Sequence, residues 1–157
     1  MKNWFKHLAA AGLAVAFLGA GMTTSPAYAD AVKDRKAAMK SIGKANKAIK
    51  AYVAGKGDLA AAVAGAKKIA SVGHNFVGFF PKGSDAGYGK THRAKAAIWS
   101  DWDKFKKANS AMITASNNFA NWSKMGDAAT LKGAQKAIGK SCGGCHKPFR
   151  GPKLKKK

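Results

Sequence analysis

Hydrophobic residues recur at helical spacing along much of the chain, and this periodicity constrains the fold more than any other feature of the sequence. In the clearest segment the steps alternate between four and three residues, through Ile98, Trp102, Phe105, Asn109, Met112, Ser116 and Phe119. Such spacing places side chains on a single face of an α-helix. No segment alternates with a period of two for more than a few residues, so strands are not predicted.

Three further segments show helical periodicity. The first spans about residues 30–53, with a seven-residue repeat through Val32, Met39, Asn46 and Val53 and with Ile42 and Ile49 between them. A second helix is predicted to begin after Asp58, a residue type that caps helix N-termini well. A last helix is predicted after Gly126-Asp127, ends at Gly151-Pro152, and carries Leu131, Ala134, Ile138, Cys142, Cys145 and Phe149 on one side.

Four helices, three of them with near-heptad spacing, predict an all-α protein, an antiparallel four-helix bundle. The longest predicted connection runs from about residue 73 to residue 93 and contains Phe76, Phe79 and Phe80. A loop of this length in a compact domain is often functional or covers a ligand.

The first 29 residues have the features of an export signal. Lys2 and Lys6 precede an uncharged apolar run from Leu8 to Ala20, and Ala27-Tyr28-Ala29 supplies small residues where a signal peptidase cleaves. The run is short for a membrane anchor, the alternative interpretation, which needs about 20 residues. We therefore expect a signal peptide at 1–29 and a mature four-helix domain at 30–157, located in a bacterial periplasm or outside the cell.

The chain is strongly basic, with 29 Lys and Arg against 7 acidic residues and a net charge of +22. Loss of Lys2 and Lys6 with the signal would leave +20. A hydrophobic content of 46% excludes an ordinary disordered polycation. The charge predicts an anionic partner, but charge alone does not distinguish nucleic acid, lipid and an acidic protein.

The chemistry of the chain is concentrated in Cys142-Gly143-Gly144-Cys145-His146, a C-x-x-C-H sequence of the kind that attaches c-type haem. On a helix, cysteines three residues apart lie on one face, so both can form thioethers with the haem vinyl groups. The next residue can then direct its imidazole at the iron. One such sequence predicts one haem c.

Two other uses of this sequence are weaker. A redox-active dithiol usually lies at the start of a helix that follows a strand, whereas this pair lies near the end of a helix. A zinc site would need two further ligands, and only His74 and His92 are available in the mature chain.

A four-helix bundle with a single C-x-x-C-H sequence near its C-terminus resembles the class II cytochromes c, which include cytochrome c prime and low-spin relatives of the cytochrome c-556 type. The resemblance covers nearly the whole mature chain. It extends to residues 34–43, 80–84 and 97–101, and to residues 142–150, where Phe149 stands at a position at which tyrosine is also common.

The resemblance implies two functional types that differ at the sixth coordination position of the iron. In the low-spin relatives a methionine of the first helix binds the iron, and Met39 occupies that position here. In cytochrome c prime an apolar side chain blocks that face, the iron is five-coordinate, and nitric oxide or carbon monoxide can bind. We expect His146 and Met39 as iron ligands of a periplasmic electron carrier, with the five-coordinate type as the alternative and with Met39 then only a core residue.

The resemblance also implies that Arg35, one turn before Met39, and Arg150, one turn after His146, contact haem propionates. Solvated surface arginines are the alternative. Neither functional type is an enzyme. The expected partner is an acidic redox protein or an anionic membrane surface, reached through lysines such as Lys104, Lys106 and Lys147, and not nucleic acid. The protein is expected to be a monomer or a homodimer.

Overall fold

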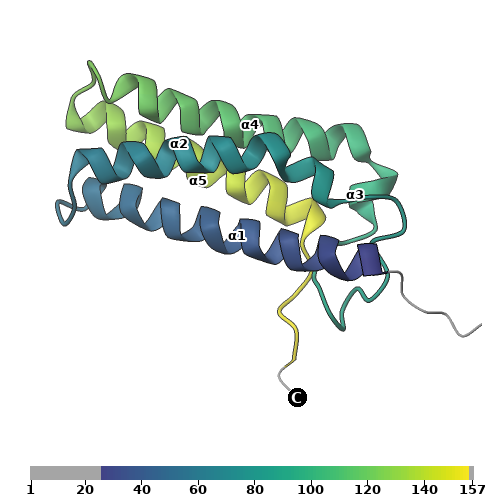
Figure 1. The fold of residues 1–157 in the computed structure, drawn as a ribbon. Coiled ribbons are helices and arrows are strands. Elements are labelled where there is room, and N and C mark those ends of the chain that lie inside the picture. The colour runs from purple at the N-terminus through teal and green to yellow at the C-terminus, as the bar shows by residue number, and fades with distance from the viewer. Residues whose placement is uncertain (1–25, 156–157) are drawn as a thin grey trace, which may run out of the picture.

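The computed structural model describes residues 26–155, and its long helices lie side by side in a bundle (Figure 1). They are α1 (Pro26–Val53), α2 (Leu59–Phe76), a 3₁₀ turn (Val77–Phe79), α3 (Ala97–Ser100), α4 (Trp102–Trp122) and α5 (Ala128–Phe149). Within residues 26–155 the only β-type pairings are the isolated bridges Tyr88–His92 and Ala94–Arg150. The prediction of an antiparallel four-helix bundle is therefore confirmed. The predicted signal peptide lies mostly outside the described residues, and α1 includes its last few positions.

The four long helices form a ring around a shared core. α1 packs on α2, α2 on α4, and α4 on α5, while α1 and α5 close the ring with far less contact. Small and apolar residues fill the centre, among them Ile49, Ile69, Phe119, Leu131 and Ile138. The seam between α1 and α5 is thus the loosest of the bundle. Among the described residues, no helix is long and apolar enough to cross a membrane.

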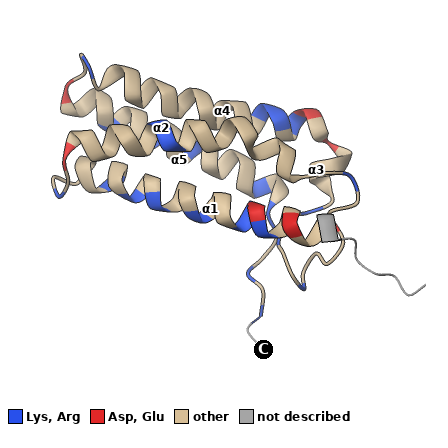
Figure 2. Cartoon of the chain, viewed as in Figure 1, with Lys and Arg blue, Asp and Glu red and all other residues tan. Residues whose placement is uncertain are grey.

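The predicted helix starts at Asp58 and Asp127 are confirmed. The Asp58 carboxylate accepts a hydrogen bond from the Ala61 amide at 2.8 Å, and the Asp127 carboxylate accepts one from the Thr130 amide at 2.7 Å. These contacts satisfy amide groups that have no partner within the first turn of a helix. Carboxylates thus lie near helix starts, whereas lysines are spread along the helices (Figure 2).

The apolar stripe of α1 is only partly the predicted one. Ile42 and Ile49 are buried as predicted, whereas Val32, Met39, Asn46 and Val53 are only half-buried. The other buried positions are Ala31, Arg35, Ala38 and Ala45. The helix is rotated because its alanines face α2. At the tightest point a Cβ on Gly65 would lie 2.6 Å from the Ala45 carbonyl oxygen. Small residues therefore decide which face of α1 is buried.

Two predicted boundaries are also wrong. α2 continues through residue 76, so Phe76 belongs to the helix and not to the loop. The third predicted helix is divided at Asp101, whose φ of −127° and ψ of 54° separate α3 from α4. Behind this break an aromatic cluster joins the loop to the bundle. Phe105 packs at 4.8 Å from Phe80 and 5.4 Å from Phe149, measured between ring centroids.

Candidate functional site

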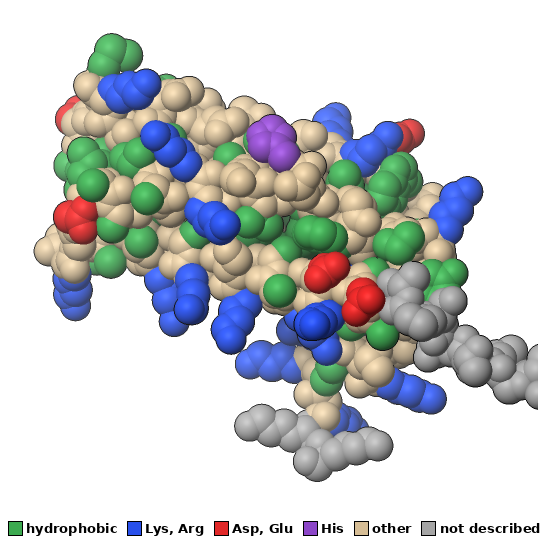
Figure 3. Space-filling model, viewed as in Figure 1, with side chains coloured by type: hydrophobic (Ala, Val, Ile, Leu, Met, Phe, Trp, Pro, Cys, Tyr) green, Lys and Arg blue, Asp and Glu red, His purple; other side chains and the backbone are tan. Residues whose placement is uncertain are grey.

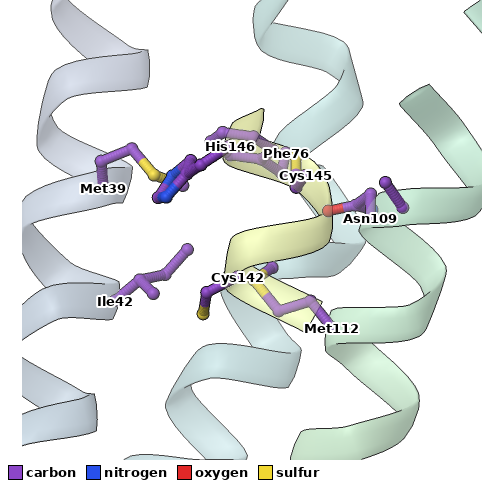
Figure 4. Close-up of a pocket in the computed structure, with 9 residues that line it drawn as sticks. Met39, Ile42, Phe76, Asn109, Met112, Cys142, Cys145 and His146 are labelled. Carbon is purple, nitrogen blue, oxygen red and sulfur yellow. The ribbon is translucent and has the colours of Figure 1, made fainter. Parts of the chain in front are cut away.

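Cys142, Cys145 and His146 lie together on α5 and face a small cavity inside the bundle (Figure 4). The cavity has a volume of about 30 Å³ and is bounded by four helices. Its lining residues are Met39 and Ile42 of α1, Phe76 of α2, Ala108, Asn109 and Met112 of α4, and Cys142, Cys145 and His146 of α5. The structure thus brings the predicted attachment residues and the predicted sixth ligand to one place.

The end of α5 is held by the long loop. The Lys95 amide donates to the Phe149 carbonyl at 3.0 Å, and the Gly151 amide donates to the Arg93 carbonyl at 2.7 Å. The Arg93 side chain donates twice to the Gly151 carbonyl, at 2.9 and 2.6 Å. These bonds fix the last turn of α5, which carries His146, against the loop before α3.

The two sulfurs are free thiols on one helical face. Burial raises the pKa of Cys142, and burial together with the neighbouring Cys142 raises the pKa of Cys145 to about 11. A redox-active dithiol needs the opposite, a thiol whose pKa is lowered so that it ionises near neutral pH. The surroundings of the pair therefore argue against a thioredoxin-like role.

We expect Cys145 to react slowly with iodoacetamide in protein produced without attached haem. The thiolate is the reacting form, and its pKa of about 11 lies above the ordinary value of 9.0. At pH 8 the rate should be about 100-fold below that of an exposed thiol, and it should rise with pH up to about 11. Tandem mass spectrometry that localises the label to Cys145 measures this rate with Cys142 in place, because Cys142 contributes to the raised pKa. The same protein in urea is the control. Equal rates in the folded and denatured protein would contradict the prediction.

His146 is suited to bind a metal through a neutral ring. Burial lowers its pKa, and the positive charges of Arg150 and Arg93 lower it further. Below this pKa the imidazole is protonated and cannot bind a metal, so a lowered pKa widens the pH range in which it can serve as a ligand. The C-x-x-C-H residues therefore have the donor set and the environment that a covalent haem requires.

Met39 lies across the cavity from α5, with its sulfur beside the His146 ring in Figure 4. The side chain is half-buried and packs against two apolar clusters, the central core around Ile49 and Phe119 and the aromatic cluster around Phe80 and Phe105. This position is consistent with either predicted role, as an iron ligand or as an apolar cover. Ligation by Met39 stays a prediction.

Arg35 is buried, with 6% of its surface exposed, and most of its guanidinium is used within the protein. Nε donates to the Phe79 carbonyl and Nη2 to the Ser84 carbonyl, both at 2.8 Å. Its Cζ also lies 4.7 Å from the Phe80 ring centroid. The solvated alternative is wrong for Arg35, and its main contacts are with the loop. The remaining nitrogen, Nη1, is buried without a partner and could bind an anionic group.

Arg150 is exposed and lies at the C-terminal end of α5, where its charge acts on His146. A propionate contact for Arg150 stays a prediction.

The two histidines named for a zinc site do not support such a site. His74 is exposed, and His92 is buried with its Nε2 at 2.9 Å from the Ala86 carbonyl oxygen. Within residues 26–155 no three His, Cys, Asp or Glu side chains are grouped to hold a metal ion.

Asn109 is a cavity residue that we did not single out from the sequence. Its Nδ2 donates to the Gly73 carbonyl at 2.9 Å, which joins α4 to α2, while its Oδ1 is buried without a partner. Phe76, which we expected in the loop, and Met112, which we expected in the core, also line the cavity. A polar side chain on the apolar stripe of α4 was the only available signal for Asn109.

The described residues fit a haem group. Both sulfurs and the imidazole lie on one face of α5, the cavity wall is almost entirely apolar, and the orphaned Arg35 nitrogen lies one turn before Met39 on α1. The α1–α5 seam borders the same cavity, and it is the place where neighbouring long helices have the least contact with each other.

Comparison with known proteins agrees with this site. A family model described as cytochrome C' matches residues 30–150. A cytochrome c' from Pararhodospirillum photometricum is 38% identical over 120 residues, which cover 76% of this chain and 94% of that protein. A cytochrome c-556 from Agrobacterium tumefaciens is 32% identical over 121 residues, covering 76% and 95%.

A solved structure extends the comparison to three dimensions. It is a nitric oxide complex of a mutant cytochrome c prime from Alcaligenes xylosoxidans, with 26% sequence identity and a TM-score of 0.70. The match covers 80% of this chain and 97% of that one. The similarity therefore spans the whole bundle, including α5 and its C-x-x-C-H sequence.

Proposed function

The chain belongs to the cytochrome c′ family as a c-type cytochrome with one haem, and we propose that His146 is the only protein ligand of its iron. In this proposal Cys142, Cys145 and His146 would hold a haem whose iron can take up nitric oxide or carbon monoxide. The family match favours this type over the His/Met-ligated carrier that we expected from the sequence. The nitric oxide complex of a related cytochrome c prime gives independent support.

Each site residue has a distinct part in this function. Cys142 and Cys145 would hold the haem through thioethers, and His146 would bind the iron. A bound haem would supply a one-electron Fe(II)/Fe(III) couple and an iron able to bind a small gas. Burial and the positive charges of Arg150 and Arg93 lower the pKa of His146, which favours the neutral ring that can act as a ligand.

The observation that carries the proposal is the composition of the cavity wall across from α5. Met39, Ile42 and Phe76 form this wall, and none of them is charged or a hydrogen-bond donor. Such side chains exclude water and leave room only for a small, weakly polar ligand. Met39 packs against both apolar clusters, which holds it as a cover over this side.

A second candidate is the His/Met-ligated electron carrier. The Met39 sulfur faces the His146 ring in Figure 4, and a cytochrome c-556 is among the relatives. Methionine ligation would stabilise the reduced iron and raise its potential. The two candidates differ in the spin state of the ferric protein, which a spectrum measures directly.

The test compares wild type with Met39→Leu and Met39→Ala by visible and electron paramagnetic resonance spectra of the ferric protein. We expect a high-spin wild type and no change of spin state in Met39→Leu. In Met39→Ala, loss of the side chain over the binding side should speed nitric oxide association about tenfold, which corresponds to a barrier lowered by about 1.4 kcal/mol. Stopped-flow mixing of the ferrous protein with nitric oxide measures this rate.

Met112→Leu is the matched control, because Met112 lines the same cavity from α4. It should change neither the spin state nor the rate. A low-spin wild type that Met39→Leu converts to high spin would refute the five-coordinate proposal and establish Met39 as the sixth ligand.

The proposal includes export to the periplasm with a mature N-terminus at Asp30, the residue at which the family match also begins. The protein would bind a gas or exchange an electron without converting a substrate, so we do not propose an enzyme. The proposal includes no nucleic-acid partner, because an acidic partner protein explains the positive charge of an exported haem protein better than nucleic acid does.

A further inference from the structure

Two rows of exposed lysines run along α1 and α5. The members are Lys36, Lys40, Lys47 and Lys50 on α1 and Lys132, Lys136, Lys140 and Lys147 on α5. Within each row the steps are three, four or seven residues, which keeps the side chains on one side of the helix. We call the surface formed by these eight lysines the α1–α5 face.

Both rows border the same seam of the bundle. Met39 of α1 and His146 of α5 line the shared cavity inside the bundle. The lysines lie on the neighbouring sides of the same two helices, which face the solvent. The positive charge of Lys50 acts on the Cys142 thiol, so this lysine of α1 lies near the attachment site on α5. In Figure 3 basic side chains project from the lower edge of the molecule, where α1 runs.

Acidic residues do not belong to either lysine row. Asp30 and Asp34 lie in the second and third turns of α1, and the other carboxylates within residues 28–155 lie at helix caps, in the first turn of α4 or in loops, at positions 58, 85, 101, 103 and 127. The ion pairs of the described chain are Lys104–Asp101 at 3.5 Å and Lys106–Asp103 at 2.8 Å, both on α4. Lys104 and Lys106 therefore each have an acidic neighbour, and their expected role towards a partner stays a prediction.

Glycines replace side chains next to the seam. A Cβ on Gly43 of α1 or on Gly139 of α5 would meet no heavy atom within 4 Å. Packing does not require glycine there, although each glycine costs about 1 kcal/mol relative to alanine in a helix. Glycine at these positions leaves the backbone of α1 and α5 accessible to another molecule.

We propose that the α1–α5 face docks an acidic one-electron carrier protein that reduces the haem iron. This inference rests on the proposed function, because a redox-cycling iron needs a donor. One electron leaves the reduced centre of the partner and converts Fe(III) to Fe(II), and no bond or proton need change. Carboxylates on the partner would pair with the lysine rows, which steers encounter and brings the donor to the seam above the cavity.

A membrane surface fits this face less well than a protein does. Lasting attachment to lipid usually combines basic residues with an apolar or acyl anchor. The large hydrophobic side chains exposed in the described chain are Tyr88, Trp122 and Met125, in the long loop and near the α4–α5 turn. None of them lies on the α1–α5 face.

The test uses the haem-loaded protein with an acidic flavodoxin as probe. One variant carries Lys40→Glu, Lys47→Glu, Lys136→Glu and Lys140→Glu. The control carries Lys67→Glu, Lys68→Glu, Lys107→Glu and Lys124→Glu, which changes the net charge equally at exposed lysines of α2 and α4 and just beyond the end of α4. Binding of oxidised flavodoxin is measured by calorimetry at low salt, and haem reduction by flavodoxin hydroquinone is measured by stopped flow.

We expect the α1–α5 variant to lose affinity and reduction rate by at least about tenfold, and the control by about twofold or less. A neutral flavin semiquinone should reduce all three proteins at the same rate, because it needs no charged docking surface. Equal losses in both variants, or no loss in either, would overturn the proposal. So would unchanged flavodoxin binding together with lost binding to phosphatidylglycerol vesicles.

The ferric spectrum and nitric oxide binding of the same proteins separate this inference from the proposed function. A low-spin wild type with face-specific flavodoxin binding would refute the gas-binding function and keep the docking surface. A high-spin, nitric oxide-binding protein without face-specific binding would do the reverse.

Discussion

Replacing both Cys142 and Cys145 with serine is expected to abolish covalent haem attachment. Serine cannot form the thioether bonds, and His146 alone would hold haem only through a reversible iron–nitrogen bond. The two sulfurs lie on one face of α5 beside the cavity, and the described chain contains no other cysteine that could replace them. Haem-dependent staining after denaturing electrophoresis measures the result: a stained band for wild type and none for the double variant.

Two controls make this result specific. Cys142→Ser keeps one sulfur and should give a weaker but detectable stained band. Met125→Ser changes a side chain that is 91% exposed, and it should leave staining unchanged. Staining of the double variant would show that attachment uses other groups. An unstained wild type, produced with a working cytochrome maturation system, would return the cysteine pair to the dithiol interpretation.

The parts of the structure that sequence predicts well depend on local signals. Asp58 and Asp127 cap the helices that follow them, because a short acceptor side chain bonds the third amide of the next turn wherever the helix lies in the fold. The apolar side of α5 is confirmed at Leu131, Ile138 and Phe149. The C-x-x-C-H residues share that helix, so their relative placement follows from helical geometry alone.

The parts that sequence predicts poorly depend on contacts between distant segments. The seven-residue repeat of α1 selects Val32 and Asn46, but the close approach of Gly65 to Ala45 turns the alanine side inward. Asn109 becomes a cavity residue because its amide reaches the Gly73 carbonyl of another helix. No local sequence pattern predicts which side of α1 is buried or what Asn109 contacts, because both depend on how the helices pack against each other.

Arg35 is the strongest example, because the sequence resemblance assigns it to a haem propionate and the structure shows it holding the long loop. We expect Arg35→Met in the haem-loaded protein to lower the free energy of unfolding by about 3 kcal/mol, since it removes two hydrogen bonds from a charged donor and leaves carbonyls without a partner. One of these carbonyls belongs to Phe79, where the hydrogen bond is partly buried. The other belongs to Ser84, where the hydrogen bond is fully buried. Urea denaturation followed by far-ultraviolet circular dichroism measures the loss.

Three further measurements decide what Arg35 does. Limited proteolysis should cut the loop between residues 82 and 91 faster in Arg35→Met, because the guanidinium anchors this segment to α1. Arg35→Lys keeps the charge but cannot donate in two directions, so it should recover only part of the stability. Lys36→Met, an adjacent exposed position, should change stability by about 0.5 kcal/mol or less. If Arg35→Met retains wild-type stability and loop protection, the loop-anchoring role is wrong. If the reduction potential of that variant is also shifted, the haem propionate is the main partner of Arg35.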